Sequence, residues 1–269
     1  MALLFDSHAH YFDARFHSEE CPSGVDSLLD SLFATCELGG IVNVGTDIGT
    51  SLAAIAQAKR YPLMYAAVGI HPSDAQRYPD MGAELGKLEL LLQAPRENKI
   101  VALGEIGLDY HYPETDKKMQ AEYLDAQLSL AVKYQMPVII HDREAHGDCF
   151  DAICRHPGVF GVFHSYSGSA EMAQDLIRRG FCISFSGTIT FKNATKIAAV
   201  AASLPQDRVL IETDCPYLAP HPFRGHLNHS GLVRHTAEKL AELWGVSYEE
   251  AVAITSQNAK RLFRLWEGI

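Results

Sequence analysis

Residues 159–185, VFGVFHSYSGSAEMAQDLIRRGFCISF, contain the unit whose repetition decides the fold. The apolar runs at 159–163 and 182–185 are typical of buried parallel strands. Between them lie four apolar side chains spaced as on one face of a helix: Met172, Ala173, Leu176 and Ile177. The stretch therefore predicts a strand, a helix and a second strand parallel to the first.

The same unit recurs along the chain. Eight apolar or β-branched runs predict eight strands, at residues 3–6, 41–44, 65–69, 100–103, 138–140, 159–163, 182–185 and 209–211. Helical patterns lie between several of these strands, and the clearest covers residues 25–36. Two more helices are expected at 232–244 and 248–265, and Ser247 with Glu250 forms a capping-box pattern at the start of the second.

Eight strands alternating with helices in a chain of 269 residues predict an α/β fold, a (β/α)8 TIM barrel with an extra C-terminal helix. The alternative is an open, doubly wound sheet. No GxGxxG motif follows the first strand, and polar residues end many strands instead of clustering at one switch point. Both observations favour the barrel. No linker interrupts the pattern, so we expect a single domain over residues 1–269.

The composition indicates a folded protein without a broad basic surface. Hydrophobic residues make up 47% of the chain, and 23 Lys and Arg against 33 Asp and Glu give a formal charge of −10. Bound metal ions could still attract an anionic substrate. No apolar run approaches the roughly 18 residues of a membrane span. An early Asp6 and six cysteines without a CxxC pair lead us to expect a cytoplasmic protein without membrane contact.

Residues of metal-ligating types follow the predicted strands directly. His8 and His10 are two positions apart, so they face the barrel mouth together if Leu4 and Asp6 also do. Four later strands are followed by further candidates: Glu105, His141, His164 and Asp214. Beside an apolar strand, an imidazole or a carboxylate needs a partner that offsets its desolvation. Because the carboxyl ends of barrel strands share one rim, the pattern predicts a divalent-metal site there.

The six candidate ligands exceed what one ion needs, since a catalytic zinc site has about three protein ligands and an open position. We therefore expect two divalent metal ions, whose identity could be Zn, Mn, Fe, Co or, less suitably, Mg. A carboxylate can bridge two such ions, and a water shared between them becomes a nucleophile near neutral pH. The ions would outweigh the charges of Glu105 and Asp214 and attract a phosphate.

Eight motifs together carry a resemblance to a known family: FDSHAH (5–10), GIHP (69–72), GEIGLDY (104–110), VIIHDR (138–143), FHSYSG (163–168), SFSGTIT (184–190), ETDCPYL (212–218) and NAKRLF (258–263). In this order, and over almost the whole chain, they closely resemble the TatD family of metal-dependent deoxyribonucleases. The resemblance implies a TIM barrel, a pair of divalent ions and hydrolysis of DNA phosphodiesters, in some members as a 3′-to-5′ exonuclease. Related amidohydrolases often have a carboxylated Lys on the fourth strand, where this chain has Glu105.

The resemblance also implies a role for each ligand. His8 and His10 with Glu105 and Asp214 would hold one ion. Glu105 with His141 and His164 would hold the other. Asp214 would in addition accept a proton from the attacking water as the general base. His71 of the GIHP motif would face the substrate phosphate, unless it is a histidine hydrogen-bonded within its loop.

Four other residues are candidates for supporting roles. Many relatives have an Arg-Gly-basic-x-Asn-x-Pro loop after the eighth strand, and this chain has RGHLNHS at 224–230. Arg224 and Asn228 remain candidates for binding the substrate phosphate. Asp109, expected beyond the fourth strand, would orient a ligand or an Arg, or cap a turn. Glu212 would share a face with Asp214 on a regular strand, or bond a histidine of a neighbouring strand.

Two other functions compete with DNA hydrolysis. The same metal centre would serve a hydrolase of another bond, such as a phosphotriester, a lactone, a cyclic amide or the ester of a D-aminoacyl-tRNA. A non-catalytic binding scaffold would need missing ligands, and none is missing here. We therefore expect an enzyme with DNA as its substrate. A closed barrel has no free sheet edge that must pair, so we also expect a monomer.

Overall fold

A computed structural model describes residues 2–34 and 37–265 of the chain. Eight strands form one parallel sheet in sequence order: β1 (Leu4–Ala9), β2 (Leu38–Val44), β3 (Met64–Val68), β4 (Ile100–Asp109), β5 (Val138–Arg143), β6 (Gly161–Phe163), β7 (Cys182–Phe185) and β8 (Val209–Ile211). Every predicted strand is present. β1, β4 and β5 continue beyond their apolar runs through candidate ligands, and Asp109 is the last residue of β4 and not a residue beyond it.

Hydrogen bonds between the first and last strands close the sheet into a barrel. Ala9 forms a parallel bridge with Cys215, just after β8. The backbone N–H of His10 donates to the carbonyl of Cys215 at 2.8 Å, and that of Asp214 donates to the carbonyl of His8 at 2.9 Å. Ser7 Oγ also donates to the carbonyl of Ile211 at 2.9 Å. The predicted barrel is confirmed, and the open sheet is excluded because its edge strands would not meet.

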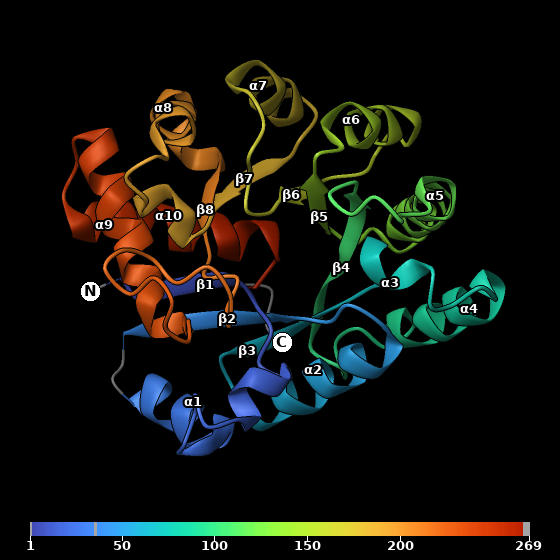
Figure 1. Cartoon of the computed structure of the whole chain (residues 1–269), viewed down its shortest axis with the longest axis horizontal. Coiled ribbons are helices and arrows are strands. Elements are labelled where there is room, and N and C mark those ends of the chain that lie inside the picture. The colour runs from blue at the N-terminus through green and yellow to red at the C-terminus, as the bar shows by residue number, and fades with distance from the viewer. Residues whose placement is uncertain (1, 35–36, 266–269) are drawn as a thin grey trace.

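Helices surround the strands, as Figure 1 shows. They are α1 (Gly24–Ala34), α2 (Ile48–Arg60), α3 (Pro72–Ala75), α4 (Met81–Leu92), α5 (Lys117–Tyr134), α6 (His146–Arg155), α7 (Ala170–Arg178), α8 (Thr195–Ser203), α9 (Val233–Trp244) and α10 (Tyr248–Leu262). Cys36, the last residue of the pattern at 25–36, lies outside the described residues. Ser247 Oγ caps α10 by accepting the N–H of Glu250 at 3.1 Å. Among the described residues, no helix is long and apolar enough to cross a bilayer.

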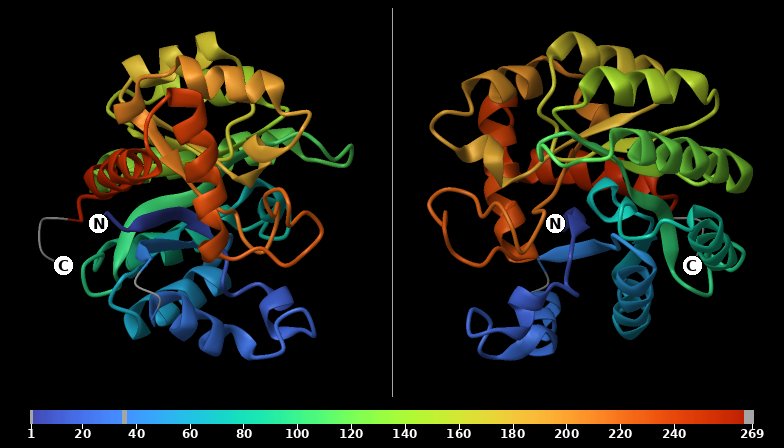
Figure 2. Two further views of the ribbon diagram at one scale, coloured as in Figure 1. Left: turned by 90° about the vertical axis from the view of Figure 1, so that its left-hand side faces the viewer. Right: turned by 45° about the vertical axis from the view of Figure 1, so that its right-hand side comes forward.

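The barrel interior is apolar near the start of the strands, and α10 packs against it there (Figure 2). Phe5 of β1 stacks on Phe263, directly after α10, with ring centroids 6.3 Å apart. Asn258 of α10 donates from Nδ2 to the carbonyls of Gln206 and Val209, at 2.7 and 2.8 Å. The extra C-terminal helix therefore covers one end of the barrel, which leaves the opposite end, where the strands finish, open for a site.

Candidate metal centre

The carboxyl ends of the strands surround a cavity of about 1130 Å³. Five of the six predicted metal ligands line it: His10, Glu105, His141, His164 and Asp214. The sixth, His8, is fully buried, yet its ring stacks on that of His164 with centroids 4.1 Å apart. The structure thus brings together side chains that are up to 206 positions apart in the sequence, from His8 to Asp214 (214 − 8 = 206).

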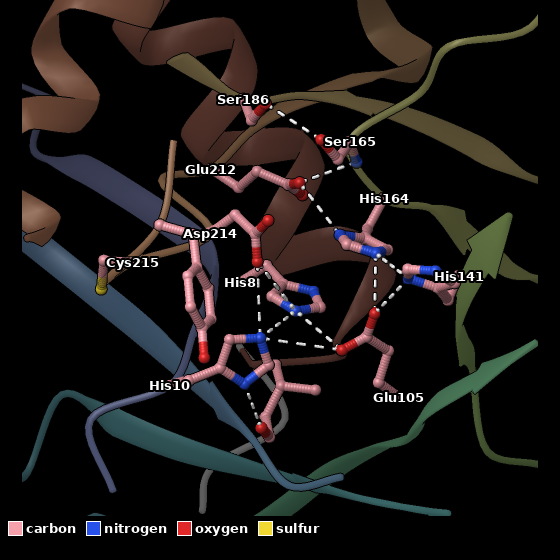
Figure 3. A network of polar contacts seen from close by, with 12 residues as sticks. His8, His10, Glu105, His141, His164, Ser165, Ser186, Glu212, Asp214 and Cys215 are labelled. Atoms are coloured by element: carbon pink, nitrogen blue, oxygen red, sulfur yellow. Dashed lines mark hydrogen bonds and ion pairs between the residues drawn. The ribbon is translucent and has the colours of Figure 1, made fainter. Parts of the chain in front are cut away.

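One group of ligand atoms lies on one side of Glu105 (Figure 3). The Nε2 atoms of His8 and His10 are 3.0 Å apart and lie 3.4 and 3.7 Å from Glu105 Oε2. Asp214 Oδ1 is 3.8 Å from His8 Nε2 and 3.4 Å from His10 Nε2. Two imidazole nitrogens and two carboxylate oxygens therefore converge, which is the donor set of a borderline divalent cation.

A second group lies on the other side of the same carboxylate. Glu105 Oε1 is 2.7 Å from His141 Nδ1 and 2.8 Å from His164 Nε2. The two histidine nitrogens are 3.2 Å apart. Glu105, in the middle of β4, thus directs one oxygen to each group, as Figure 3 shows.

Irregular backbone positions two of the ligands. The pairing of β1 with β2 shifts register between Asp6 and Ala9. Asp6 consequently points away from the cavity and accepts hydrogen bonds from Thr213 Oγ1 and Ser230 Oγ, both at 2.6 Å. The expectation that Asp6 shares the face of His8 is wrong, because an irregularity in a strand re-aims the side chains that follow it. Asp214 has a φ of 58°, a left-handed conformation that Asp tolerates better than most residues.

The outer nitrogens of three histidines are held by protein oxygens. His10 Nδ1 is 2.7 Å from the carbonyl of Val44. His141 Nε2 is 3.2 Å from Asp109 Oδ2, and His164 Nδ1 is 3.2 Å from Glu212 Oε1. A proton on each outer nitrogen leaves the lone pair of the inner nitrogen available to a cation, as in known metal sites. The side chains present therefore fit divalent cations in both groups.

Two more expectations can be compared with these contacts. Asp109 bonds His141, and Glu212 bonds His164. His164 follows β6, which β7 separates from β8, so the histidine that Glu212 bonds belongs to the next strand but one and not to a neighbouring strand. Asp109 also caps a turn, since its Oδ1 accepts the backbone N–H of His111 at 3.0 Å. The two carboxylate oxygens of Asp109 thus make the contacts that the two interpretations require, one with His141 and one with the backbone of His111.

The electrostatics of the cluster favour charged carboxylates. Burial alone would raise the pKa of Glu105, but His164, His71 and His8 hold that pKa well below its usual range. Burial opposes a charged His164 as well, yet Glu105 and Glu212 hold its pKa well above the ordinary value. Burial and the nearby His164 lower the pKa of His8. A proton on His164 balances the charge of Glu105, and a bound cation would replace it.

His71 is placed at the cavity, with its two ring nitrogens in different roles. Its Nδ1 accepts the backbone N–H of Ser73 at 3.1 Å, and its Nε2 is 3.5 Å from Glu105 Oε1. Burial, more than any other cause, lowers the pKa of His71, so the ring is neutral. An accepting Nδ1 requires the proton on Nε2, which makes His71 a hydrogen-bond donor toward the cavity in this arrangement.

The two predicted phosphate-binding residues do not reach the cavity. Asn228 is fully buried, and its Nδ2 donates to the carbonyls of Thr213 and Tyr217 at 2.8 and 2.6 Å. The expectation of substrate contact is wrong for Asn228, because its side-chain donor is used to fix the loop after β8. The guanidinium of Arg224 lies 4.2 Å from the ring centroid of Phe191, outside the cavity lining.

Several residues of the cavity wall had no role in the sequence-based prediction. They include Tyr112, Asp142, Arg143, His146 and Lys196. His146 Nδ1 is 2.8 Å from Asp142 Oδ2 at the cavity wall. The signal available in the sequence was an Asp and an Arg directly after the ligand His141, at the end of a strand.

Comparisons with known proteins agree with this geometry. A family model described as TatD related DNase matches residues 5–264. The uncharacterized metal-dependent hydrolase YabD of Bacillus subtilis (strain 168) is 40% identical over 266 residues, which cover 98% of this chain and 100% of that protein. The uncharacterized metal-dependent hydrolase TatD of Mycobacterium tuberculosis is 32% identical and covers 94% of this chain and 97% of its own length.

A solved structure agrees over the same span. The crystal structure of YJJV, a TatD homolog from Escherichia coli K12, matches with a TM-score of 0.85 and 31% sequence identity, and the match covers 97% of this chain and 98% of that chain. The resemblance seen in the motifs is thereby confirmed over nearly the full length of the barrel. The chain belongs to the TatD related DNase family of metal-dependent hydrolases.

Proposed function

We propose that this hydrolase cleaves phosphodiester bonds of DNA with two divalent ions held at the open end of its barrel. The observation that carries the proposal is that the two oxygens of Glu105 face two separate groups of ligand atoms. Pairs of ions about 3.5–4 Å apart serve many phosphatases and nucleases. A shared carboxylate between two ligand groups supports that kind of centre.

The protein residues divide between the two ions. His8, His10, Glu105 and Asp214 would hold one ion, and Glu105, His141 and His164 would hold the other. When bound, the ions would activate water for attack on phosphorus and offset the charge of the phosphoryl oxygens. Mixed imidazole and carboxylate ligands suit Zn, Mn, Fe and Co better than Mg.

Asp214 is suited to accept the proton of the attacking water. Burial opposes its charged form, but His10, His8 and His164 keep the pKa of Asp214 below its usual range. The carboxylate is therefore ionised at neutral pH. Its Oδ1 faces His8 and His10, whereas its Oδ2 has no hydrogen-bond partner within residues 2–34 and 37–265. Oδ2 is the atom that would take the proton.

His71 would act on the substrate itself. Its Nε2–H lies at the cavity wall, and its Nδ1 is fixed by Ser73. A neutral imidazole held in this way donates one hydrogen bond without repositioning. We assign that hydrogen bond to a phosphoryl oxygen of the substrate, where it would stabilise the charge that develops during attack.

The decisive test is a side-by-side assay with purified protein loaded with zinc or manganese. The substrates would be a single-stranded oligodeoxynucleotide, a phosphotriester, a lactone and a D-aminoacyl-tRNA. We expect hydrolysis of the oligodeoxynucleotide that stops when EDTA is added. Hydrolysis of one of the other esters, with no cleavage of DNA, would replace this proposal by a different substrate for the same centre.

A further inference from the structure

The wall of the cavity beside the metal centre includes an arginine and a histidine that the proposed chemistry does not use. Arg143 is the last residue of β5, and His146 is the first residue of α6. Both line the same cavity as Glu105 and Asp214. In a chain with a formal charge of −10, the positive charge of Arg143 at this place suits an anionic ligand.

The ring of His146 is held by a buried carboxylate. His146 Nδ1 donates to Asp142 Oδ2 at 2.8 Å, and the side chain of Asp142 is only 5% exposed. Asp142 Oδ1 is buried and has no hydrogen-bond partner among the described residues. The carboxylate of Asp142 therefore fixes the imidazole of His146 through Nδ1. Because Nδ1 is used, Nε2 is the atom of this partly exposed ring that can bind a ligand.

Arg143 has its donors free. Its guanidinium lies 5.7 Å from the ring centroid of Tyr112, so the exposed Arg143 side chain packs against this ring. No carboxylate in the described part of the chain forms an ion pair with it. The cavity carboxylates closest in sequence have other partners, since Asp109 bonds His141 and Asp142 bonds His146. The fork of Arg donors suits a phosphate.

We propose that Arg143 and His146 form a second anion site, which binds the phosphate next to the scissile phosphate of the substrate. The inference rests on the proposed phosphodiesterase function. Arg143 would donate through its fork, and His146 would donate from Nε2 while Asp142 accepts from Nδ1. Asp142 is a positioning residue in this arrangement. A substrate with one phosphate would occupy the metal centre alone, and a substrate with two would occupy both sites.

The first experiment compares the dinucleotide TpT with the same dinucleotide carrying one more phosphate, at its 5′ end (pTpT) or its 3′ end (TpTp). Metal-loaded wild type should prefer one phosphorylated form over TpT by about tenfold in kcat/KM, the size of one charge-assisted hydrogen bond. Arg143→Gln, His146→Gln and Asp142→Asn should each reduce that preference toward one. Zinc content and melting temperature would show that each variant is folded and loaded.

Lys118→Gln is the matched control, because Lys118 is 86% exposed on α5 and is not part of the cavity wall. It removes one positive charge and should keep the full preference. Equal turnover of all three dinucleotides by wild type would overturn the second site and leave the proposed function standing. An equal loss of activity on all three dinucleotides in the variants would also overturn the second site, because that result fits a purely structural contact between Asp142 and the start of α6.

A second experiment does not depend on hydrolysis. Inorganic phosphate would be titrated into zinc-loaded protein while NMR follows the imidazole signals of His146, assigned by their loss in His146→Gln. The signals should shift to saturation, and Arg143→Gln should weaken the apparent affinity by about tenfold. The Lys118→Gln control should behave as wild type. Unmoved His146 signals would overturn the inference, even if the protein cleaved no DNA.

Discussion

Glu105 is the residue that the two groups of ligand atoms share. Its side chain is 4% exposed, and its oxygens contact four histidines of the cluster within 3.5 Å: His8, His71, His141 and His164. Such a carboxylate affects both ions at once, whereas each histidine directly affects one. Its replacement should therefore have a larger effect on metal content than the replacement of any single imidazole.

We expect Glu105→Gln to lower the rate of hydrolysis by orders of magnitude and to reduce the bound metal below two equivalents. The amide keeps the volume of the side chain, so the fold should be retained. Steady-state kinetics and elemental analysis of the purified variant test this. His8→Ala should lower the rate as strongly while removing one ligand of one ion. Full activity in either variant would contradict the assignment of the centre.

Asp214→Asn separates the role of a base from that of a substrate contact. Asn presents a similar shape but does not accept a proton from water at neutral pH. We expect kcat to fall by about a hundredfold or more, in the range seen for general bases, while KM changes little. Steady-state kinetics with an oligodeoxynucleotide would measure both constants. A change confined to KM would mean that Asp214 contacts substrate and does not move the proton.

At the scale of elements, a glycine of β4 allows this strand to pack close to β5. Gly107 lies between Glu105 and Asp109, has a φ of +149°, and a Cβ at this position would lie 1.9 Å from the carbonyl oxygen of His141. Gly107→Ala should therefore push β4 away from β5 and destabilise the protein by about 3 kcal/mol. Urea denaturation with EDTA present would measure the loss.

Gly86 provides the matched control for Gly107. It lies on the exposed side of α4, and a Cβ there would meet no atom within 4 Å. Gly86→Ala should stabilise the protein by about 0.5–1 kcal/mol, because alanine loses less backbone freedom in a helix. If both variants had the same stability as wild type, the close contact between β4 and β5 would not exist in solution.

Asp47, at the start of α2, makes the stability of the fold depend on pH. Its Oδ1 accepts the N–H of Thr50 at 2.7 Å, and its Oδ2 accepts the hydroxyl of Tyr78 at 2.7 Å. Burial works against the charge, but these hydrogen bonds lower the pKa of Asp47. A lowered native pKa means that the ionised form stabilises the fold. This stabilisation is complete above the unfolded pKa of about 3.9 and is lost as pH falls through the native pKa.

Asp47→Ala should therefore cost about 1 kcal/mol at pH 7, as for other helix caps, and less at pH 3. Urea denaturation of both proteins in EDTA, at several pH values, gives the difference directly. Asp47→Asn keeps an oxygen that can cap α2 and has no charge to titrate. Its stability relative to Asp47→Ala should vary little with pH. A cost for Asp47→Ala that is constant from pH 3 to pH 7 would contradict the role of the charge.

At the scale of the whole molecule, the metal ions should hold the barrel together as well as serve catalysis. The ligands come from β1 and the residue after it, from β4 and β5, and from the residues after β6 and β8, so an ion that binds the native state bridges distant parts of the chain. At a hundred times the dissociation constant, one bound ligand stabilises the native state by about 2.7 kcal/mol. We expect EDTA to lower the melting temperature by several degrees.

The control for this effect is a histidine outside the centre. His235 is paired with Glu238 on α9, so His235→Ala should keep the full response to metal. His8→Ala should lose most of this response of the melting temperature to metal. Differential scanning calorimetry with zinc and with EDTA would compare them. Identical melting temperatures of wild type in both conditions would show that the cluster does not bind the ion.

Most of the barrel could be predicted from the sequence because the strand signals are local. An apolar run followed by an imidazole or a carboxylate is visible without knowledge of any distant residue, and five such junctions contain the six ligands. Asn228 was assigned wrongly for the opposite reason. Whether its amide faces substrate or the carbonyls of Thr213 and Tyr217 depends on the path of the loop after β8.

The sequence by itself determined the eight strands, their order of appearance and the chemical types at their ends, because periodicity and side-chain chemistry belong to short stretches of chain. Only the tertiary structure decided which nitrogen of each histidine faces inward, that Asp6 turns away from His8, and that Asp142 holds His146 at the cavity wall. These features follow from backbone irregularities and from contacts across the barrel. Their partners are set by the closed sheet, which no single stretch of sequence contains.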